Sequence, residues 1–484
     1  MTDPTDPNEI DLPGLVIAGR VVSGLTCDSR AVKPGWLFAA FEGSQVDGRE
    51  YIGAAVEAGA SVILAKPGTP VPAGAVLLPE ESPRQAFAHL AAQFHGVQPA
   101  TQAAVTGTNG KTSVASFLRQ IWRSAGETSA SIGTLGLVAD GFPNPGGLTT
   151  PDPEKLSAQL AALAEHGVTH LAIEASSHGL DQFRLDGLEP RACGFTNLSR
   201  DHLDYHGDME SYFTAKARLF TDLLAEDGTA VINADDAYGQ RMIEICAGRG
   251  LAVIDYGKQA TKIAITQVRA QSFGLELGLE VEGEATYIDL PLIGAFQAWN
   301  ALCAAGLAAA TGLDLQRAIG ALMDLEGAPG RMEPIGEVPG GGAVFVDYAH
   351  TPDALETALK ALRPHCAGRL YVVFGAGGDR DKGKRPLMGE KASTFADGVI
   401  VTDDNPRSED PAAIRAEIIA AAPKAHNIAD RAVAIQAGLE SLTPGDILLI
   451  AGKGHETGQT VGTEILPFDD RALARTLIGA ETPT

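Results

Sequence analysis

A glycine-rich turn, Gly107-Thr108-Asn109-Gly110-Lys111-Thr112, carries the clearest chemistry in the sequence. It follows a short apolar segment and opens an amphipathic helical pattern that runs to Trp122. The two glycines let backbone N–H groups close around phosphate oxygens, and the start of a helix adds a positive dipole. The lysine ammonium can neutralise terminal phosphates, and the Thr112 hydroxyl can ligate Mg²⁺. The turn predicts a polyphosphate site, although Val105 stands where the general phosphate-loop pattern has a glycine. The alternative is an ordinary tight turn with an exposed lysine.

A carboxylate, Glu174, ends a second apolar segment that begins at His170. The carboxyl ends of parallel strands meet at one edge of a sheet, so we expect this side chain near the phosphate loop. Mg²⁺ prefers oxygen ligands from one or two side chains together with substrate phosphates, which Thr112 and Glu174 could supply. The alternative is a solvent-facing loop at a strand end.

Two histidines spaced by four occur in Asp201-His202-Leu203-Asp204-Tyr205-His206. A zinc site is excluded, because the metalloprotease motif needs Glu where Leu203 stands and no third ligand lies at metal-site spacing. His202 is either a ligand of a second Mg²⁺ or a hydrogen-bonded structural histidine. Lys216, within the helical pattern 212–220, is by itself an ordinary lysine on a helix surface.

Three polar segments follow strand-like segments nearer the carboxyl end of the chain. The first, 375–385, is glycine-rich and strongly basic, which suggests a bound anion in an otherwise acidic protein. The others are Asp404-Asn405-Pro406-Arg407 and Gly452-Lys453-Gly454-His455-Glu456. Together they predict a mixed-charge pocket for a small zwitterion.

Composition bounds the class of protein. With 484 residues the chain should hold two to four domains, and we expect three. A hydrophobic content of 45% and a charged content of 20% indicate a globular protein. The net charge of −24 argues against nucleic-acid binding. Five scattered cysteines indicate reduced thiols, and the absence of a signal peptide or long apolar run predicts a cytoplasmic protein without membrane insertion.

The elements that must position these residues fall into three predicted domains. Residues 1–98 resemble a small α/β domain, and Pro99 marks its boundary. Residues 99–328 alternate strand and helix patterns, which favours a parallel sheet covered on both faces. Its strands are expected to end at Thr106, Ser176, Asn197, Asn233 and Tyr256.

The sequence pattern then changes: apolar and polar residues alternate over 263–293, which predicts an antiparallel appendage before an alanine-rich helix, 297–310. The break at 327–330 marks the second boundary. Residues 329–484 predict a Rossmann-like, doubly wound sheet. Its four expected strands are Ala343–Asp347, Leu370–Phe374, Gly398–Thr402 and Asp446–Ala451.

These motifs resemble those of the Mur ligases, the ATP-dependent amino-acid ligases of peptidoglycan synthesis. The resemblance runs from Asp28-Ser29-Arg30 to Gly452-Lys453-Gly454-His455-Glu456, and the late glycine of the phosphate loop is the family's own variant. It implies a three-domain α/β fold with a phosphate-loop ATPase domain at its centre. It also implies a monomeric ligase that adds meso-2,6-diaminopimelate to UDP-N-acetylmuramoyl-L-alanyl-D-glutamate, with ATP as co-substrate and Mg²⁺ as cofactor.

The resemblance also implies roles for individual residues. Catalysis would rest on Lys111, Glu174, His202 and Lys216, the last as a carbamate that joins Thr112, Glu174 and His202 around Mg²⁺. ATP would contact Gly107, Thr108, Asn109, Gly110, Lys111, Thr112, Ser113, Asn300, Arg331 and Asp347. The UDP-substrate would contact Cys27, Ser29, Gln45, Val46, Asp47, Thr149, Thr150, Ser176, Gln182 and Arg184. Diaminopimelate would contact Arg380, Asp404, Asn405, Pro406, Arg407, Gly452 and Glu456.

The chain departs from the family pattern at Cys27 and Leu148, where related enzymes often carry leucine and asparagine. Three alternative functions stay open on the sequence. Folylpolyglutamate synthetase resembles this family but should lack the UDP contacts and Asp404-Asn405-Pro406-Arg407. A phosphate-loop kinase or switch GTPase would share the loop without a ligase domain, and no guanine-selecting Asn-Lys-x-Asp run occurs. A non-catalytic sugar-nucleotide binding protein is the third.

Overall fold

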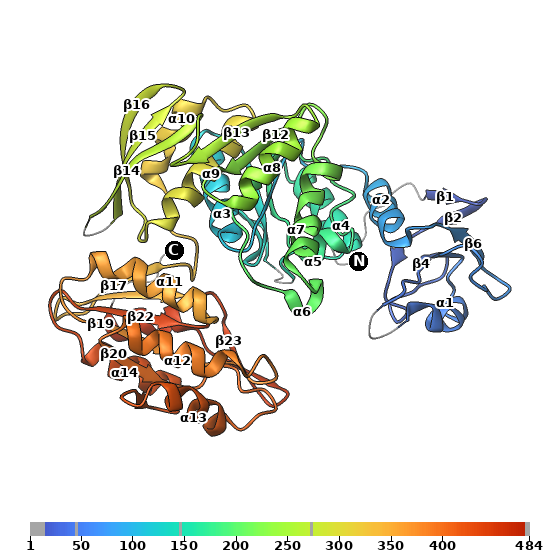
Figure 1. Ribbon diagram of the computed structural model, residues 1–484. Helices are drawn as coiled ribbons and strands as arrows, with labels where there is room; N and C mark the ends of the chain where they lie inside the picture. Colours follow the sequence, from blue (N-terminus) through green and yellow to red (C-terminus); the bar gives the residue numbers. More distant parts are fainter. Residues whose placement is uncertain (1–14, 44–46, 145–147, 272–273, 480–484) are drawn as a thin grey trace, which may run out of the picture. The chain divides into compact units, whose positions relative to one another are not determined.

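The structure is a computed structural model that describes residues 15–43, 47–144, 148–271 and 274–479 (Figure 1). The chain divides into two compact units. The first comprises Met1–Asp255 with Cys303–Leu315, and the second comprises Tyr256–Leu302 with Gln316–Thr484. The divisions fall within β13 (Ala252–Gly257) and within α9 (Phe296–Ala310).

The first unit begins with a hairpin of β1 (Leu15–Ile17) and β2 (Arg20–Val22), followed by a small parallel sheet in the order β3-β4-β5-β6. One face of this sheet packs under α2 through Phe87, and the other packs under α1 through Ile52. The expected small α/β domain is therefore confirmed, although the sequence reading did not identify α2. The bounds are β3 Leu25–Thr26, β4 Leu37–Ala39, η1 Gly48–Tyr51, α1 Ile52–Glu57, β5 Val62–Ala65, β6 Val76–Pro79 and α2 Pro83–His95.

A larger sheet in the same unit has the strand order β12-β11-β7-β10-β8-β9. All of its pairs are parallel except the hairpin of β8 with β9, so the prediction of a parallel sheet is confirmed. Two strands stop earlier than expected, because β10 ends at Glu174 and β11 at Phe195. The strands are β7 Thr101–Thr106, β8 Ser129–Gly133, β9 Gly136–Ala139, β10 His170–Glu174, β11 Ala192–Phe195 and β12 Thr229–Asn233.

Helices cover this sheet, and α3 (Lys111–Ser124) directly follows the strand that carries the phosphate loop (Figure 1). Its apolar residues are buried, including Phe117, Ile121 and Trp122, which confirms the amphipathic helix predicted from the sequence. The remaining helices are α4 Pro153–Glu165, α5 Ser177–Asp181, α6 Leu203–His206, α7 Met209–Arg218, the π-helical turn η2 Leu219–Leu223, and α8 Ala237–Gly248.

In the second unit, β14 (Ile263–Gln271), β15 (Gly274–Val281) and β16 (Glu284–Leu290) pair antiparallel. The predicted antiparallel appendage is confirmed, as is the alanine-rich helix α9 that follows it. After it come α10 (Leu315–Gly320) and η3 (Ala321–Asp324).

A second sheet in this unit has the order β17-β18-β22-β19-β20-β21. The four expected strands are present as β18, β22, β19 and β20, which pair parallel; β21 adds a short parallel strand at one edge, and β17 adds an antiparallel strand at the other. Helices α11, α12 and α13 pack on one face, whereas α14 and α15 pack on the other, so the sheet is doubly wound.

The bounds of this sheet and its helices are β17 Glu333–Glu337, β18 Ala343–Asp347, α11 Pro352–Leu362, η4 Arg363–His365, β19 Leu370–Phe374, α12 Lys384–Phe395, β20 Gly398–Val401, α13 Pro411–Ala421, β21 His426–Asn427, α14 Arg431–Glu440, β22 Ile447–Ala451, β23 Gly458–Val461, β24 Glu464–Pro467 and α15 Asp470–Ile478. Within the described ranges, no helix has both the length and the apolarity that crossing a bilayer requires.

Candidate active site

The phosphate loop closes between the end of β7 and the start of α3. Gly107 has φ 149° and Gly110, the N-cap of α3, has φ 91°, which is backbone that L side chains rarely adopt. A Cβ at Gly107 would lie 1.9 Å from Thr196 Oγ1, so only glycine fits there. The Lys111 ammonium donates to Gly107 O at 2.9 Å and to Thr108 O at 3.0 Å. The lysine is therefore folded over the loop where phosphates would bind.

Glu174 lies beside this loop, as predicted. The buried Thr112 hydroxyl donates to Glu174 Oε2 at 3.0 Å. The other carboxylate oxygen accepts from Thr134 N at 2.8 Å, and the Thr134 hydroxyl donates to Oε2 at 3.1 Å. Thr134 was not identified from the sequence, because it lies just beyond β8, a strand that no motif marked. The buried oxygen set of Thr112 and Glu174 suits a hard divalent cation that keeps water and phosphate ligands.

Lys216 is not a surface lysine, since it is 1% exposed. Its Nζ donates to Gly107 O at 2.8 Å and lies 4.6 Å from the centre of the Tyr212 ring. Burial, together with the nearby Lys111 charge, lowers the pKa of Lys216 well below its usual value. The structure thus brings Lys216 to the phosphate loop as an amine that is easily deprotonated, and the bland interpretation of a helix-surface lysine is wrong.

His202 lies in a cluster of aromatic rings. It is the N-cap of α6 with φ 52°, and its ring centre is 4.9 Å from that of His178. His178 also lies 5.5 Å from His206, and burial lowers the pKa of both His178 and His206. In the described part of the chain, no group of three or more His, Cys, Asp or Glu side chains could hold a metal ion. The roles of His202 as a second magnesium ligand or as a structural histidine therefore both stay predictions.

The residues expected to hold the UDP-substrate on the larger sheet form one network. The Thr150 hydroxyl lies 2.9 Å from Ser176 Oγ and donates to Glu174 O at 2.9 Å. Arg184 donates to Thr150 O at 2.9 Å and to Gln182 Oε1 at 2.8 Å. Thr149 joins the same network through Thr134 at 3.2 Å. This network therefore continues directly into the phosphate-loop network.

The N-terminal part of the expected UDP site is less completely described. Cys27 and Ser29 follow β3, and Asp47 caps η1, whereas Gln45 and Val46 lie outside the described residues. A cavity of about 210 Å³ opens nearby. Its lining mixes aromatic, basic and acidic side chains: Phe41, Glu42, Arg49, Lys66, Glu81, Arg84 and Phe183. Arg49 and Lys66 both pair with Glu42, so carboxylate already neutralises part of this positive charge.

Glu154 joins the two sheets of the first unit. From the first turn of α4, it accepts from Cys27 N at 3.1 Å and from the Thr26 hydroxyl at 3.4 Å. Burial, with a smaller contribution from Asp152, raises the pKa of Glu154 to about 7. Burial also raises the pKa of the Cys27 thiol to about 12, so Cys27 remains a neutral thiol.

Replacement of Glu154 by glutamine is expected to stabilise the protein, relative to the unmodified protein, more at pH 8 than at pH 5. The folded protein holds a proton on Glu154 that the unfolded chain has already lost above about pH 4.5. The stability that this group contributes is therefore present at pH 4 and is lost as the pH rises toward 7. We expect the free energy of unfolding of Glu154→Gln, relative to the unmodified protein, to rise by about 1–2 kcal/mol between pH 5 and pH 8.

Urea unfolding at the two pH values measures this difference. Glu165→Gln, at the exposed far end of the same helix, is the matched control and should show no such change. Equal shifts for both variants would contradict the assignment to Glu154.

In the second unit, two residues expected at the nucleotide are ordered by local contacts. Asn300 is buried in α9 and donates to Gln297 Oε1 at 2.9 Å. Asp347, at the end of β18, accepts from Met332 N at 2.7 Å and from Ala349 N at 2.8 Å. Burial raises the pKa of Asp347, and the nearby Arg331 charge opposes that shift.

The segments expected to form the zwitterion pocket meet at the carboxyl ends of the second sheet. Gly452 has φ 114°, and a Cβ there would lie 2.7 Å from Asp404 Oδ2, so the two segments touch. Asn405 donates to Glu456 Oε2 at 3.0 Å, and Arg407 donates to Gly378 O at 2.7 Å. The structure therefore brings together the segments that carry Asp404, Asn405, Pro406, Arg407, Gly452 and Glu456.

The basic loop 375–385 is less free to bind an anion than its sequence suggested. Arg385 is fully buried and pairs with Glu409 at 2.8 Å and with Glu417 at 3.0 Å. Lys382 also pairs with Glu409, at 3.2 Å. Distant carboxylates thus neutralise part of the positive charge, which local sequence could not reveal. Arg380 is exposed on the same loop.

The fold and the site define a class of protein: a nucleotide-binding α/β enzyme with a phosphate loop on one parallel sheet and a cluster of polar and charged side chains at the carboxyl ends of another. Sequence profiles of three domains match in order along the chain: "Mur ligase family, catalytic domain" at residues 21–95, "Mur ligase middle domain" at 105–308, and "Mur ligase, glutamate ligase domain" at 330–454.

Curated relatives are similar over nearly the whole chain. A UDP-N-acetylmuramoyl-L-alanyl-D-glutamate--2,6-diaminopimelate ligase of Bradyrhizobium diazoefficiens is 54% identical over 461 residues, which are 94% of each chain. The ligase of the same name from Rhizobium meliloti is 52% identical, over 95% of this chain and 94% of its own. A solved structure of that name is 36% identical, with a TM-score of 0.71 and 95% of each chain covered. The chain belongs to the Mur ligase family, and the predicted family and fold class are confirmed.

Proposed function

We propose that this chain is the ATP-dependent ligase that joins meso-2,6-diaminopimelate to UDP-N-acetylmuramoyl-L-alanyl-D-glutamate in cytoplasmic peptidoglycan precursor synthesis. Relatives with about half of their residues identical carry that activity in their names. The observation that supports it most strongly is the buried Thr112–Glu174 contact beside a phosphate loop covered by Lys111 and Lys216. We further propose three domains, 1–98 for the UDP-substrate, 99–328 for ATP and 329–484 for the amino acid.

The proposed reaction has two steps. The side-chain carboxylate of the D-glutamyl residue attacks the γ-phosphorus of ATP, which forms an acyl phosphate and releases ADP. The amine of diaminopimelate then attacks the acyl carbon, its nitrogen loses a proton as the amide bond forms, and inorganic phosphate leaves with the electron pair of the broken C–O bond. Both reactants of the first step are anionic, so the site must neutralise charge at the transferring phosphoryl group.

The residues of this chain supply that neutralisation and the positioning. Lys111 would bind the terminal phosphates, and the loop N–H groups would hold the remaining oxygens. Thr112 and Glu174 would hold Mg²⁺, which when bound offsets the charge of the phosphates. Thr150, Ser176 and Arg184 would orient the dipeptide.

One assay tests the proposal. Release of ADP from ATP should require both UDP-N-acetylmuramoyl-L-alanyl-D-glutamate and meso-diaminopimelate for steady turnover. A kinase or GTPase would hydrolyse or transfer phosphate without requiring these two co-substrates. A folylpolyglutamate synthetase would require a folate, and a binding protein would release no ADP. Turnover without either co-substrate would contradict the ligase assignment.

Carbamylation of Lys216 is expected, because burial lowers the pKa of its ammonium and so raises the fraction of neutral amine that can attack CO₂. A new N–C bond forms, the amine loses a proton, and the ammonium is replaced by a carboxylate that could reach Mg²⁺. A carbamate resonance should appear in carbon-13 NMR of protein equilibrated with labelled bicarbonate. Lys216→Ala should lose that signal and most of its activity, about 100-fold or more, and short carboxylic acids should restore part of it.

The matched control is Lys155→Ala, which removes an exposed lysine of the same unit. It should keep both the carbamate signal and the activity. Absence of the resonance in the unmodified protein, together with no rescue of Lys216→Ala, would return Lys216 to a purely structural role.

A further inference from the structure

Lys453 is a buried cation that none of the proposed roles uses. It follows Gly452 at the end of β22, and its side chain is 0% exposed. The ammonium donates to Asn405 Oδ1 at 3.1 Å and lies 3.3 Å from Glu456 Oε2. Burying an ammonium is costly unless it is paired and hydrogen-bonded, so these two partners account for its position. Both partners belong to the proposed amino-acid site.

The orientation of the Asn405 amide is set by Lys453 together with the backbone N–H of Thr460. Its Oδ1 accepts from Lys453 and also from Thr460 N at 2.8 Å. Two donors therefore face one end of the amide, so that end must be the oxygen and the NH₂ group must point the other way. The NH₂ group then donates to Glu456 Oε2 at 3.0 Å.

Glu456 is held through one oxygen only. Lys453 and Asn405 both approach Oε2, whereas no side chain or backbone group of the described residues hydrogen-bonds Oε1. The Glu456 side chain is 33% exposed, which contrasts with the fully buried Lys453. The carboxylate is thus fixed from behind and keeps one oxygen for a ligand.

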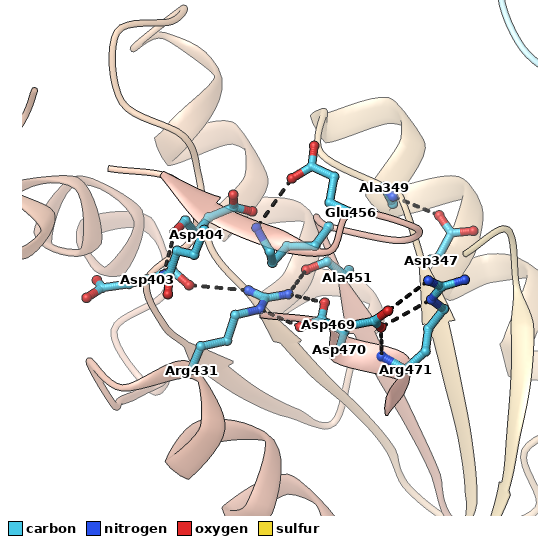
Figure 2. Close-up of polar contacts among 12 residues, drawn as sticks. Asp347, Ala349, Asp403, Asp404, Arg431, Ala451, Glu456, Asp469, Asp470 and Arg471 are labelled. Atoms are coloured by element: carbon cyan, nitrogen blue, oxygen red, sulfur yellow. Dashed lines mark hydrogen bonds and ion pairs between the residues drawn. The ribbon is translucent and has the colours of Figure 1, made fainter. Parts of the chain in front are cut away.

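A second buried cation holds the backbone of the same loops independently. Arg431 donates to Ala451 O at 3.0 Å and to Asp403 O at 3.4 Å, and it pairs with buried Asp470 at 2.7 Å. Figure 2 shows Arg431 reaching from α14 toward the two loops, with Glu456 beyond Ala451. Loss of the Lys453 ammonium should therefore leave these loops in place and disturb the side chains alone.

We propose that Lys453 is a positioning residue for selection of the amino acid, which rests on the proposed function of this site. Its ammonium orients the Asn405 amide and the Glu456 carboxylate so that Oε1 is presented to the remote ammonium group of the incoming diamino diacid. Without it, only the Thr460 N–H holds the amide oxygen, and the Glu456 carboxylate loses its charged partner. Lys453 itself touches neither the substrate nor the reacting atoms.

The test compares meso-diaminopimelate with 2-aminopimelate, which lacks the remote amino group. In the unmodified protein, KM for diaminopimelate should be much lower than KM for 2-aminopimelate. In Lys453→Met, KM for diaminopimelate should rise roughly 10- to 100-fold, and the preference between the two amino acids should fall toward one. KM for ATP and for the UDP-substrate should stay within about twofold, as expected when only this contact is lost.

Controls separate positioning from folding. Lys424→Met, on an exposed turn of the same unit, should keep the preference unchanged. Lys453→Gln retains a hydrogen-bond donor and gives a second variant should the methionine variant not fold. Unchanged preference in a folded Lys453 variant, or an equal rise of every KM, would overturn the inference. Failure of the unmodified protein to use diaminopimelate would instead overturn the proposed function.

Discussion

Replacement of Lys111 by alanine is expected to lower kcat by about a thousandfold or more while the UDP-substrate still binds. The ammonium lies over the loop, at 2.9 Å from Gly107 O and 3.0 Å from Thr108 O. In the proposed reaction a carboxylate attacks a phosphoryl group, and negative charge accumulates where this ammonium is placed. Removal of the ammonium leaves that charge unbalanced in the transition state, whereas the UDP-substrate network around Thr150 is untouched.

Coupled measurement of ADP release gives kcat, and isothermal calorimetry gives the affinity for the UDP-substrate. Lys262→Ala removes an exposed lysine of the antiparallel appendage and serves as the control, with activity close to that of the unmodified protein. Turnover of Lys111→Ala within tenfold of normal would remove the phosphate-loop role of this residue. Equal loss of binding and turnover would point instead to a folding defect.

The phosphate loop was predictable because its geometry is determined locally. The strand before it, the helix after it and the two glycines all lie within a few residues of one another. Gly107 lies so close to Thr196 that a residue with a Cβ would clash there. The N–H groups at the start of the following helix point toward the place where phosphate would bind. For the same reason, the doubly wound sheet near the carboxyl end could be read from its apolar strands and the turns between them.

The parts that the sequence reading missed depend on pairs of residues far apart in the chain. Burial of Lys216 results from packing of α7 near the loop at Gly107, 109 positions away. The sequence predicted that Arg385 belongs to an anion-binding loop, whereas in the structure its guanidinium pairs with Glu409 and Glu417. Strands β8 and β9 and helices α14 and α15 lack a motif, so only their place in the packed structure identifies them. Local sequence carries no signal of such long-range partners.

The second large effect is expected at Arg407, where lysine should not replace arginine. The backbone of Arg407 has φ 51° and is held by β23, since its N–H donates to Thr460 O at 3.2 Å and its carbonyl accepts from Gly462 N at 2.8 Å. One guanidinium nitrogen is used by Gly378 O. The remaining donors form a planar fork that matches a carboxylate, which an ammonium cannot reproduce.

For Arg407→Lys we expect KM for meso-diaminopimelate to rise about 100-fold, because its remote carboxylate loses a two-point contact. L-lysine has the remote ammonium but no remote carboxylate, so its already poor use should change little. The preference for diaminopimelate over L-lysine should therefore collapse in Arg407→Lys, measured as the ratio of kcat/KM values. Arg363→Lys alters an exposed arginine paired with Asp397 and should keep the ratio. An unchanged ratio in Arg407→Lys would show that the carboxylate is recognised elsewhere, since the Glu456 contact, which both amino acids share, cannot distinguish them.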